Sequence, residues 1–145
     1  MYEDIPPAAR MMTLSSFDDL LQAARLQPER QRLLFVFAAA ELPEDCTPAQ
    51  RARFEAGQGG ALTPLVCADK TPDEVPGFQA LVEESRQFGE QWSVVFVAAL
   101  SGRDGRAPSS EDAEKPLERM IELLQAGSPG PMIAFDRQGR VLSLG

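Results

Sequence analysis

The sequence predicts an α/β fold in which a mixed sheet of four or five strands is covered by packed helices. Two observations lead to this prediction. Apolar runs of strand length alternate with segments whose apolar residues recur at helical spacing, and the chain can be divided into two similar α-β-α-β halves, the second followed by a C-terminal hairpin strand. The length of 145 residues suits one core. We therefore expect residues 13–145 to form a single α/β domain.

The first half, residues 16–70, begins with a predicted helix and a predicted strand. Ser16 is a typical N-cap, and Asp19 lies where a negative charge favours the helix dipole. From Phe17 onward, apolar residues recur at i, i+3, i+4 and i+7, which places them on one helical face. Residues 33–40 (LLFVFAAA) contain no polar side chain, as is typical of a strand covered on both faces.

A second helix and a second strand complete this half. Residues 47–50 (TPAQ) form a capping box with proline at the first helical position, and the helix should continue to about Ala56. The second strand is predicted at residues 65–68. It should begin after Pro64, because proline cannot donate a hydrogen bond to a sheet.

The second half, residues 77–137, repeats this order. It contains a helix from Phe78 to Gly89, and then a strand at residues 92–100 whose Trp92 we expect, together with Phe88, in the core.

A further helix and a hairpin follow. The helix carries a stripe of apolar residues from Ala113 to Leu124, and Pro116 should lie in its first turn, because a proline deeper in a helix breaks a hydrogen bond. A hairpin with strands at 132–135 and 141–144 is predicted around residues 136–139.

The two halves also resemble each other residue by residue. Residues 17–39 align without a gap on residues 78–100, and seven positions are identical where average residue usage gives about one or two. A duplication explains these matches, although two ordinary helix–strand units could look alike because burial demands similar residues. Right-handed crossovers would make the two strands of each half parallel, and hence the sheet mixed.

Composition and charge exclude several functions. The net charge of −8 and the pI near 4.6 disfavour nucleic acids and anionic membranes as partners. The absence of histidine removes the usual general base and the commonest metal ligand, so we expect no metal and no cofactor. No apolar run is long enough to cross a membrane. Residues 1–12 do not resemble a signal peptide; we expect them to be a disordered extension or to follow from an upstream start codon.

The two cysteines, Cys46 and Cys67, are too few for a disulfide framework or a zinc site, and they suit a reducing, cytoplasmic environment. Cys46 precedes a predicted helix, where a thiolate can be stabilised, so it is a candidate redox or nucleophilic residue. Neighbouring acidic residues oppose that role. Cys67 lies in a predicted apolar strand, where we expect a small core residue.

The best candidate for ligand binding is the loop at residues 101–110, which leaves the end of a predicted strand and enters a helix. Arg103, Arg106, Ser109 and Ser110 offer two positive charges and two hydroxyl groups, which suit an anion or a nucleotide phosphate. The acidic residues around them favour a different interpretation, a solvated loop with a serine cap. The spacing matches neither common phosphate-binding motif.

Three stretches resemble a family of short uncharacterised bacterial proteins sometimes labelled ribonucleotide reductase subunit alpha. They are residues 17–43 (FDDLLQAARLQPERQRLLFVFAAAELP), 51–62 (RARFEAGQGGAL) and 101–114 (SGRDGRAPSSEDAE). The resemblance covers residues 13–145 and implies a bacterial protein. It does not imply the activity in the label, because that enzyme needs several redox-coupled cysteines around a large barrel. It supplies no catalytic residue.

The sequence therefore leaves three functions open. The first is a non-enzymatic interaction or regulatory module that binds a protein through a face or an edge of its sheet. The second is a sensor of a small anion or nucleotide that uses the loop at residues 101–110. The third is a thiol-dependent enzyme or redox sensor at Cys46. The oligomeric state is left open by all three.

Overall fold

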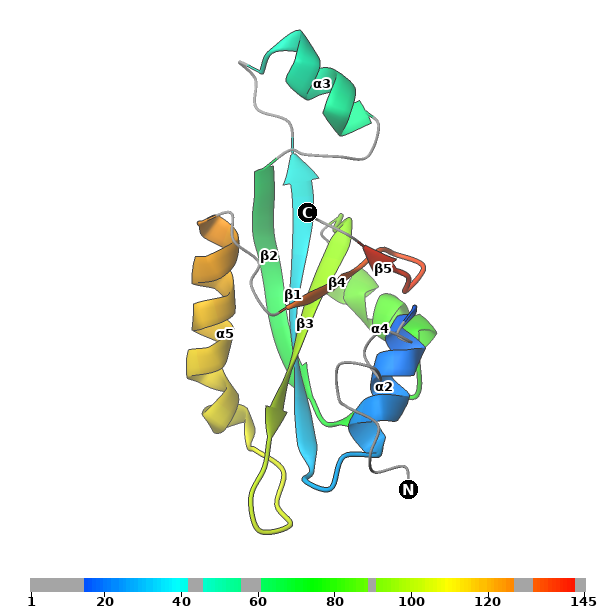
Figure 1. Ribbon diagram of the computed structural model, residues 1–145, viewed down its shortest axis with the longest axis vertical. Helices are drawn as coiled ribbons and strands as arrows, with labels where there is room; N and C mark the ends of the chain where they lie inside the picture. The colour runs from blue at the N-terminus through cyan, green and yellow to red at the C-terminus, as the bar shows by residue number, and fades with distance from the viewer. Residues whose placement is uncertain (1–14, 42–45, 56–60, 89–90, 127–131, 143–145) are drawn as a thin grey trace, which may run out of the picture.

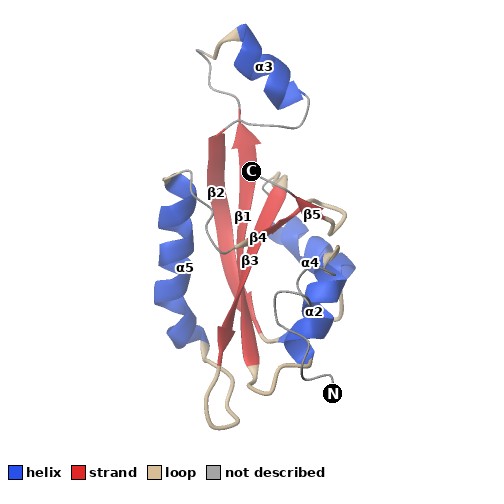
Figure 2. Cartoon of the chain, in the orientation of Figure 1, coloured by secondary structure: helices blue, strands red, loops and turns tan. Residues whose placement is uncertain are grey.

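The computed structural model describes residues 15–41, 46–55, 61–88, 91–126 and 132–142. They form a five-stranded sheet with helices packed on both faces, which confirms the predicted α/β class (Figures 1 and 2). The predicted disordered extension, residues 1–12, lies outside the described residues. The strands are β1 (Gln31–Glu41), β2 (Ala61–Lys70), β3 (Val94–Ser101), β4 (Ile133–Phe135) and β5 (Val141–Leu142). The helical segments are α2 (Phe17–Arg25), α3 (Pro48–Glu55), η2 (Pro72–Glu74), α4 (Phe78–Ser85), η3 (Arg86–Phe88) and α5 (Ser110–Gln125).

The strand order is β2-β1-β3-β4-β5, and every neighbouring pair is antiparallel. The prediction of parallel strands within each half is therefore wrong. In the first half, the reason is the position of α3, which lies beyond the ends of β1 and β2 instead of crossing back over the sheet (Figure 1). Its described side chains are exposed. The two strands are therefore joined by a long hairpin connection, which makes them antiparallel.

The interior strand predicted at residues 33–40 is confirmed, because β1 pairs with β2 on one side and β3 on the other. Its side chains alternate between two separate cores, as strand geometry requires. Leu33, Phe35 and Phe37 face the layer that contains α2 and α4. Leu34, Val36 and Ala38 face α5 on the other side of the sheet.

The core beneath α2 and α4 is rich in aromatic residues. Phe17 lies 6.0 Å from Phe35 and 5.4 Å from Phe78 between ring centroids, and Phe37 contacts Trp92 at 5.1 Å. Trp92 is 3% exposed, which confirms its predicted place in the core, and its indole N–H donates to a serine hydroxyl at 2.9 Å. The side chain of Phe88 lies outside the described residues.

The other core lies beneath α5, whose buried residues follow the predicted apolar stripe. They are Ala113, Leu117, Met120 and Leu124. The prediction for Pro116 is wrong, because α5 already begins at Ser110 and the proline lies inside the helix. It cannot donate to the carbonyl four residues earlier, a loss offset by the packing of residues on either side of it.

The two halves share their order of elements but not their strand faces. Phe17 and Phe78, which match in sequence, both pack in the aromatic core. Phe35 and Phe96 also match in sequence, yet Phe35 faces the aromatic core and Phe96 faces the core beneath α5. The gapless sequence alignment therefore does not join equivalent positions in the strands. The helices α3 and α5 differ too, because only α5 packs on the sheet.

Candidate functional site

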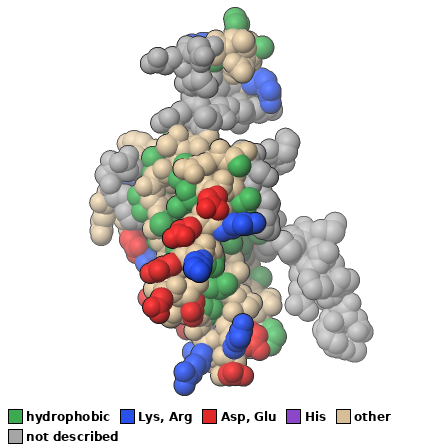
Figure 3. Space-filling view, turned by 90° about the vertical axis from the view of Figure 1, so that its left-hand side faces the viewer, with side chains coloured by type: hydrophobic (Ala, Val, Ile, Leu, Met, Phe, Trp, Pro, Cys, Tyr) green, Lys and Arg blue, Asp and Glu red, His purple; other side chains and the backbone are tan. Residues whose placement is uncertain are grey.

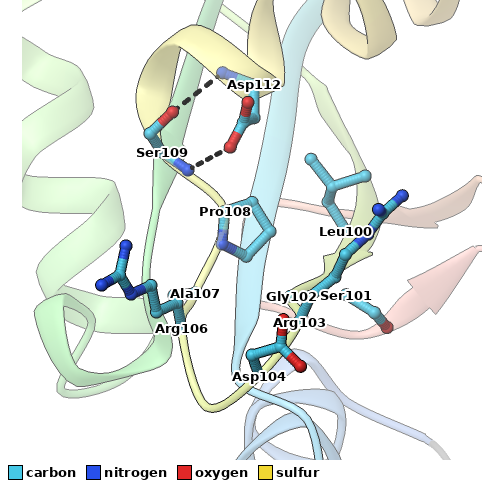
Figure 4. Close-up of a pocket in the computed structure, with 10 residues that line it drawn as sticks. All are labelled: Leu100, Ser101, Gly102, Arg103, Asp104, Arg106, Ala107, Pro108, Ser109 and Asp112. Carbon is cyan, nitrogen blue, oxygen red and sulfur yellow. Dashed lines mark hydrogen bonds between the residues drawn. The ribbon is translucent and has the colours of Figure 1, made fainter.

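A hollow of about 930 Å³ lies between the end of β3, the loop at residues 101–110 and the first turn of α5 (Figure 4). The loop is a two-residue hairpin, because the backbones of Arg103 and Arg106 exchange hydrogen bonds of 3.0 and 2.9 Å. Asp104 and Gly105, at φ 51° and 76°, form its left-handed turn. Gly102 permits this close approach, because a Cβ there would lie 1.8 Å from the carbonyl oxygen of Arg106.

The two arginines predicted to bind an anion are exposed and point to opposite sides of the loop (Figure 4). The carboxylates of Asp104 and Asp112 line the same hollow, so its formal charges cancel. Arg103 and Arg106 therefore do not converge on one point in the way that anion recognition by paired arginines requires. The anion site stays a prediction.

Ser109 forms the serine cap that the sequence analysis gave as the alternative interpretation. Its hydroxyl accepts from the backbone N–H of Asp112 at 3.1 Å, and its own N–H donates to the Asp112 carboxylate at 3.0 Å. Hydrogen bonds from the backbone and the side chain of Ser109 to its carboxylate hold the pKa of Asp112 below its ordinary value, and the positive charges of Arg103 and Arg32 act in the same direction. The polar groups of Ser109 are thus engaged within the helix cap.

Ser110 belongs to a second cluster, which the sequence analysis missed. Its hydroxyl donates to Asp69 of β2 at 2.6 Å, and Arg32 of β1 binds the same carboxylate oxygen at 2.6 Å. Arg32 also donates to the carbonyl of Pro108 at 2.5 Å. The Arg32–Asp69–Ser110 cluster therefore fastens the start of α5 to two strands. In the sequence, Arg32 and Asp69 are charged residues next to apolar runs. Only the pairing register of β1 and β2 brings them together.

The prediction that Cys67 is a small core residue is wrong, because this residue is exposed. The reason is that β2 is the edge strand of the sheet. The strand is also longer than predicted, since it runs through Pro64. The register of β1 and β2 shifts between Phe37 and Ala38, and this irregularity next to Pro64 shows why an edge strand tolerates the proline.

The backbone of β2 presents hydrogen-bonding groups to the open side of the sheet. Gly102 donates to the carbonyl of Arg30 at 2.8 Å, so even-numbered residues of β1 direct their backbone groups to β3 and odd-numbered ones to β2. Phe35 therefore bonds to its β2 partner Ala68. The neighbours of Ala68 in β2, Cys67 and Asp69, direct their N–H and C=O groups outward, away from β1. No strand lies on that side within the described residues.

Cys46 is half-buried and precedes α3, as predicted. The predicted capping box is confirmed: the backbone N–H of Thr47 donates to the side-chain oxygen of Gln50 at 2.8 Å, and the backbone N–H of Gln50 donates to the Thr47 hydroxyl at 3.1 Å. Both cysteines are free thiols. The structure does not bring Cys46 together with any of the other predicted site residues, so the redox role stays a prediction.

No group of three histidine, cysteine or acidic residues is placed to hold a metal ion within the described ranges. None of the helices in this part of the chain is long and apolar enough to span a membrane.

Comparisons with protein families, with curated proteins and with solved structures found nothing that matches this chain. The resemblance to the family labelled ribonucleotide reductase subunit alpha therefore stays a prediction.

Proposed function

We propose that this chain is a non-enzymatic protein-interaction module that takes up an extended segment of a partner by strand addition to β2. The observation that carries the proposal is the position of β2, a ten-residue strand at the end of the sheet. An unpaired strand edge is a template for another chain, and main-chain hydrogen bonds supply the affinity in this mode of recognition.

The backbone groups of Cys67 and Asp69 would form these bonds, because they point away from β1. The strand is also held firmly. Asp69 is tied to Arg32 and Ser110, and the neighbouring Lys70 forms an ion pair with Glu84 at 2.9 Å. A strand fixed in this way loses little conformational freedom when a partner binds.

A matched pair of variants tests the proposal. Cys67→Pro removes an N–H that points outward, whereas Cys67→Ala removes the thiol and keeps the N–H. We expect affinity-tagged chain to capture a partner from the source cells, Cys67→Ala to retain it, and Cys67→Pro to reduce its recovery at least tenfold. Both variants should fold, which circular dichroism would check.

Hydrogen exchange on the purified complex locates the contact. The amides of Cys67 and Asp69 should exchange rapidly in the free chain and slowly with the partner bound. A partner retained by Cys67→Pro, or unchanged exchange at both amides, would overturn strand addition at β2. Partner loss in Cys67→Ala would indicate chemistry of the thiol in place of backbone pairing.

A further inference from the structure

The flank of α5 that lies along the open edge can be identified from one contact. Ser110 donates to Asp69, so the side of the helix that carries Ser110 is the side toward β2. Glu114 and Glu118 follow at four-residue spacing and share this flank. Ile121, about three turns after Ser110, lies there too. Both glutamates are exposed, and Ile121 is half-buried.

These glutamates lie level with the outward-pointing part of β2. The helix and the strand run in opposite directions, as the colours of Figure 1 show. From the contact between Ser110 and Asp69, Glu114 lies about 6 Å along the helix. Cys67 lies about 6.6 Å along the strand from the same contact. A strand added beside Cys67 would therefore pass beneath Glu114 and then Glu118.

The exposed side chains of Glu114 and Glu118 make this flank negatively charged. Neither Glu114 nor Glu118 forms an ion pair within the described part of the chain. Like charges four residues apart destabilise a helix, so this spacing has a cost for the isolated chain. Figure 3 looks onto the side of the molecule that carries α5 and shows acidic side chains there, with several Lys and Arg side chains among them.

We propose that the segment taken up by β2 is basic, with lysine or arginine at every second position on the side of α5. This inference rests on the strand addition proposed above. Cys67 pairs with Val36, whose side chain faces the core beneath α5, so the partner residue opposite Cys67 would point to the same side. A basic residue there reaches Glu114, and one two positions along reaches Glu118.

The same charges argue against a second copy of this chain as the occupant. Antiparallel pairing of two β2 strands about a twofold axis would place both α5 helices on one face of the joined sheet. Their Glu114 and Glu118 flanks would then face each other across the new strand pair. With a net charge of −8 on each copy, that arrangement is repulsive.

Three synthetic octapeptides test the inference on the full chain. They alternate threonine with lysine, with glutamate or with serine, and fluorescence anisotropy at low salt measures their binding. We expect the lysine peptide to bind most tightly. The double variant Glu114→Gln with Glu118→Gln should weaken its binding about five- to tenfold, because exposed ion pairs contribute modestly. The matched control, Glu29→Gln with Glu55→Gln, removes the same charge from exposed positions outside α5 and should leave binding unchanged.

The outcomes separate this inference from the function on which it rests. If the serine peptide binds as tightly as the lysine peptide and Cys67→Pro abolishes both, strand addition holds and the basic preference is wrong. If the lysine peptide binds but Cys67→Pro has no effect, the contact is electrostatic and strand addition is wrong. Equal weakening by the two double variants also overturns the inference. Concentration-dependent dimerisation blocked by Cys67→Pro would identify a second copy as the occupant.

Discussion

The two edges of the sheet differ in length and in how they are covered. β2 extends for ten residues and pairs only with β1 within the described part of the chain. β5 has two residues, and the segment before α2 covers the chain beside it. Val141 donates to the carbonyl of Ser15 at 3.1 Å, and Phe17 donates to the carbonyl of Gly139 at 2.7 Å. One edge is closed by the chain itself, and the other is open.

This difference is informative because open edges are a hazard that proteins usually reduce. Short strands, prolines, bulges and covering segments all prevent pairing with other chains. The β5 edge uses a short strand and a covering segment. The β2 edge has Pro64 and an irregular register at one end, but the stretch from Cys67 to Lys70 pairs regularly with β1 and remains open. An edge left open beside a charged helix flank is consistent with a binding role.

The largest expected effect comes from disturbing the closed edge at Gly139. Its φ of 80° is unfavourable for other residues, and a Cβ would lie 2.9 Å from Cγ of Phe78. Gly139→Ala should therefore lower the free energy of unfolding by about 2–5 kcal/mol, from the left-handed backbone and from overpacking. Urea denaturation measures this change.

Gly105 provides the matched control for that prediction. It has a similar φ of 76°, but its missing Cβ would meet nothing within 4 Å. Gly105→Ala should cost only the backbone part, about 1–2 kcal/mol. Equal losses in the two variants would contradict the tight packing between the hairpin and α4.

The next effect compares two neighbouring residues of the open edge. Ala68→Pro removes an N–H that bonds to Phe35 of β1, and the acceptor left behind should cost about 1–3 kcal/mol in urea denaturation. Cys67→Pro removes an N–H that faces outward and should cost clearly less. If Cys67→Pro were the more destabilising variant, the backbone directions assigned to β2 would be wrong.

The smallest expected effect is a change of stability with pH, and it again concerns the closed edge. The backbone N–H and the hydroxyl of Ser15 donate to Asp19 at 3.0 Å, and these bonds hold its pKa below the ordinary value. A lowered folded-state pKa stabilises the fold above the unfolded-state pKa, near 4, and this contribution is lost as the pH falls through the folded-state value. The difference in the free energy of unfolding between the native chain and Asp19→Asn should shrink as the pH falls from about 5 to about 2. A constant difference would contradict it.

Local signals predicted much of the fold. The Ser16 cap accepts from the N–H of Asp19 at 3.2 Å, as expected. The hairpin before Val141 and the buried run of β1 are also where the sequence placed them. Each depends on residues close together in the chain, where capping, turn chemistry and periodicity act directly.

The predictions that were wrong concern features that depend on contacts between residues distant in sequence. The predicted direction of β2 relative to β1 was wrong because nothing in the sequence of the α3 segment shows that this helix leaves the sheet. The exposure of Cys67 follows from the position of β2 at the edge, and an apolar run reads the same in an edge strand as in a central one. The Arg32–Asp69–Ser110 cluster needs three segments in register before any one of its members has a role.

The position of α3 has a consequence for engineering. Glu41 and Ala61 are cross-strand partners, so the chain returns to the same point after residues 42–60. A two-residue turn can join antiparallel strands whose ends meet in this way. We therefore regard the tip of that excursion as a permissive insertion point, where a fluorescent reporter or a purification tag can be placed far from both cores.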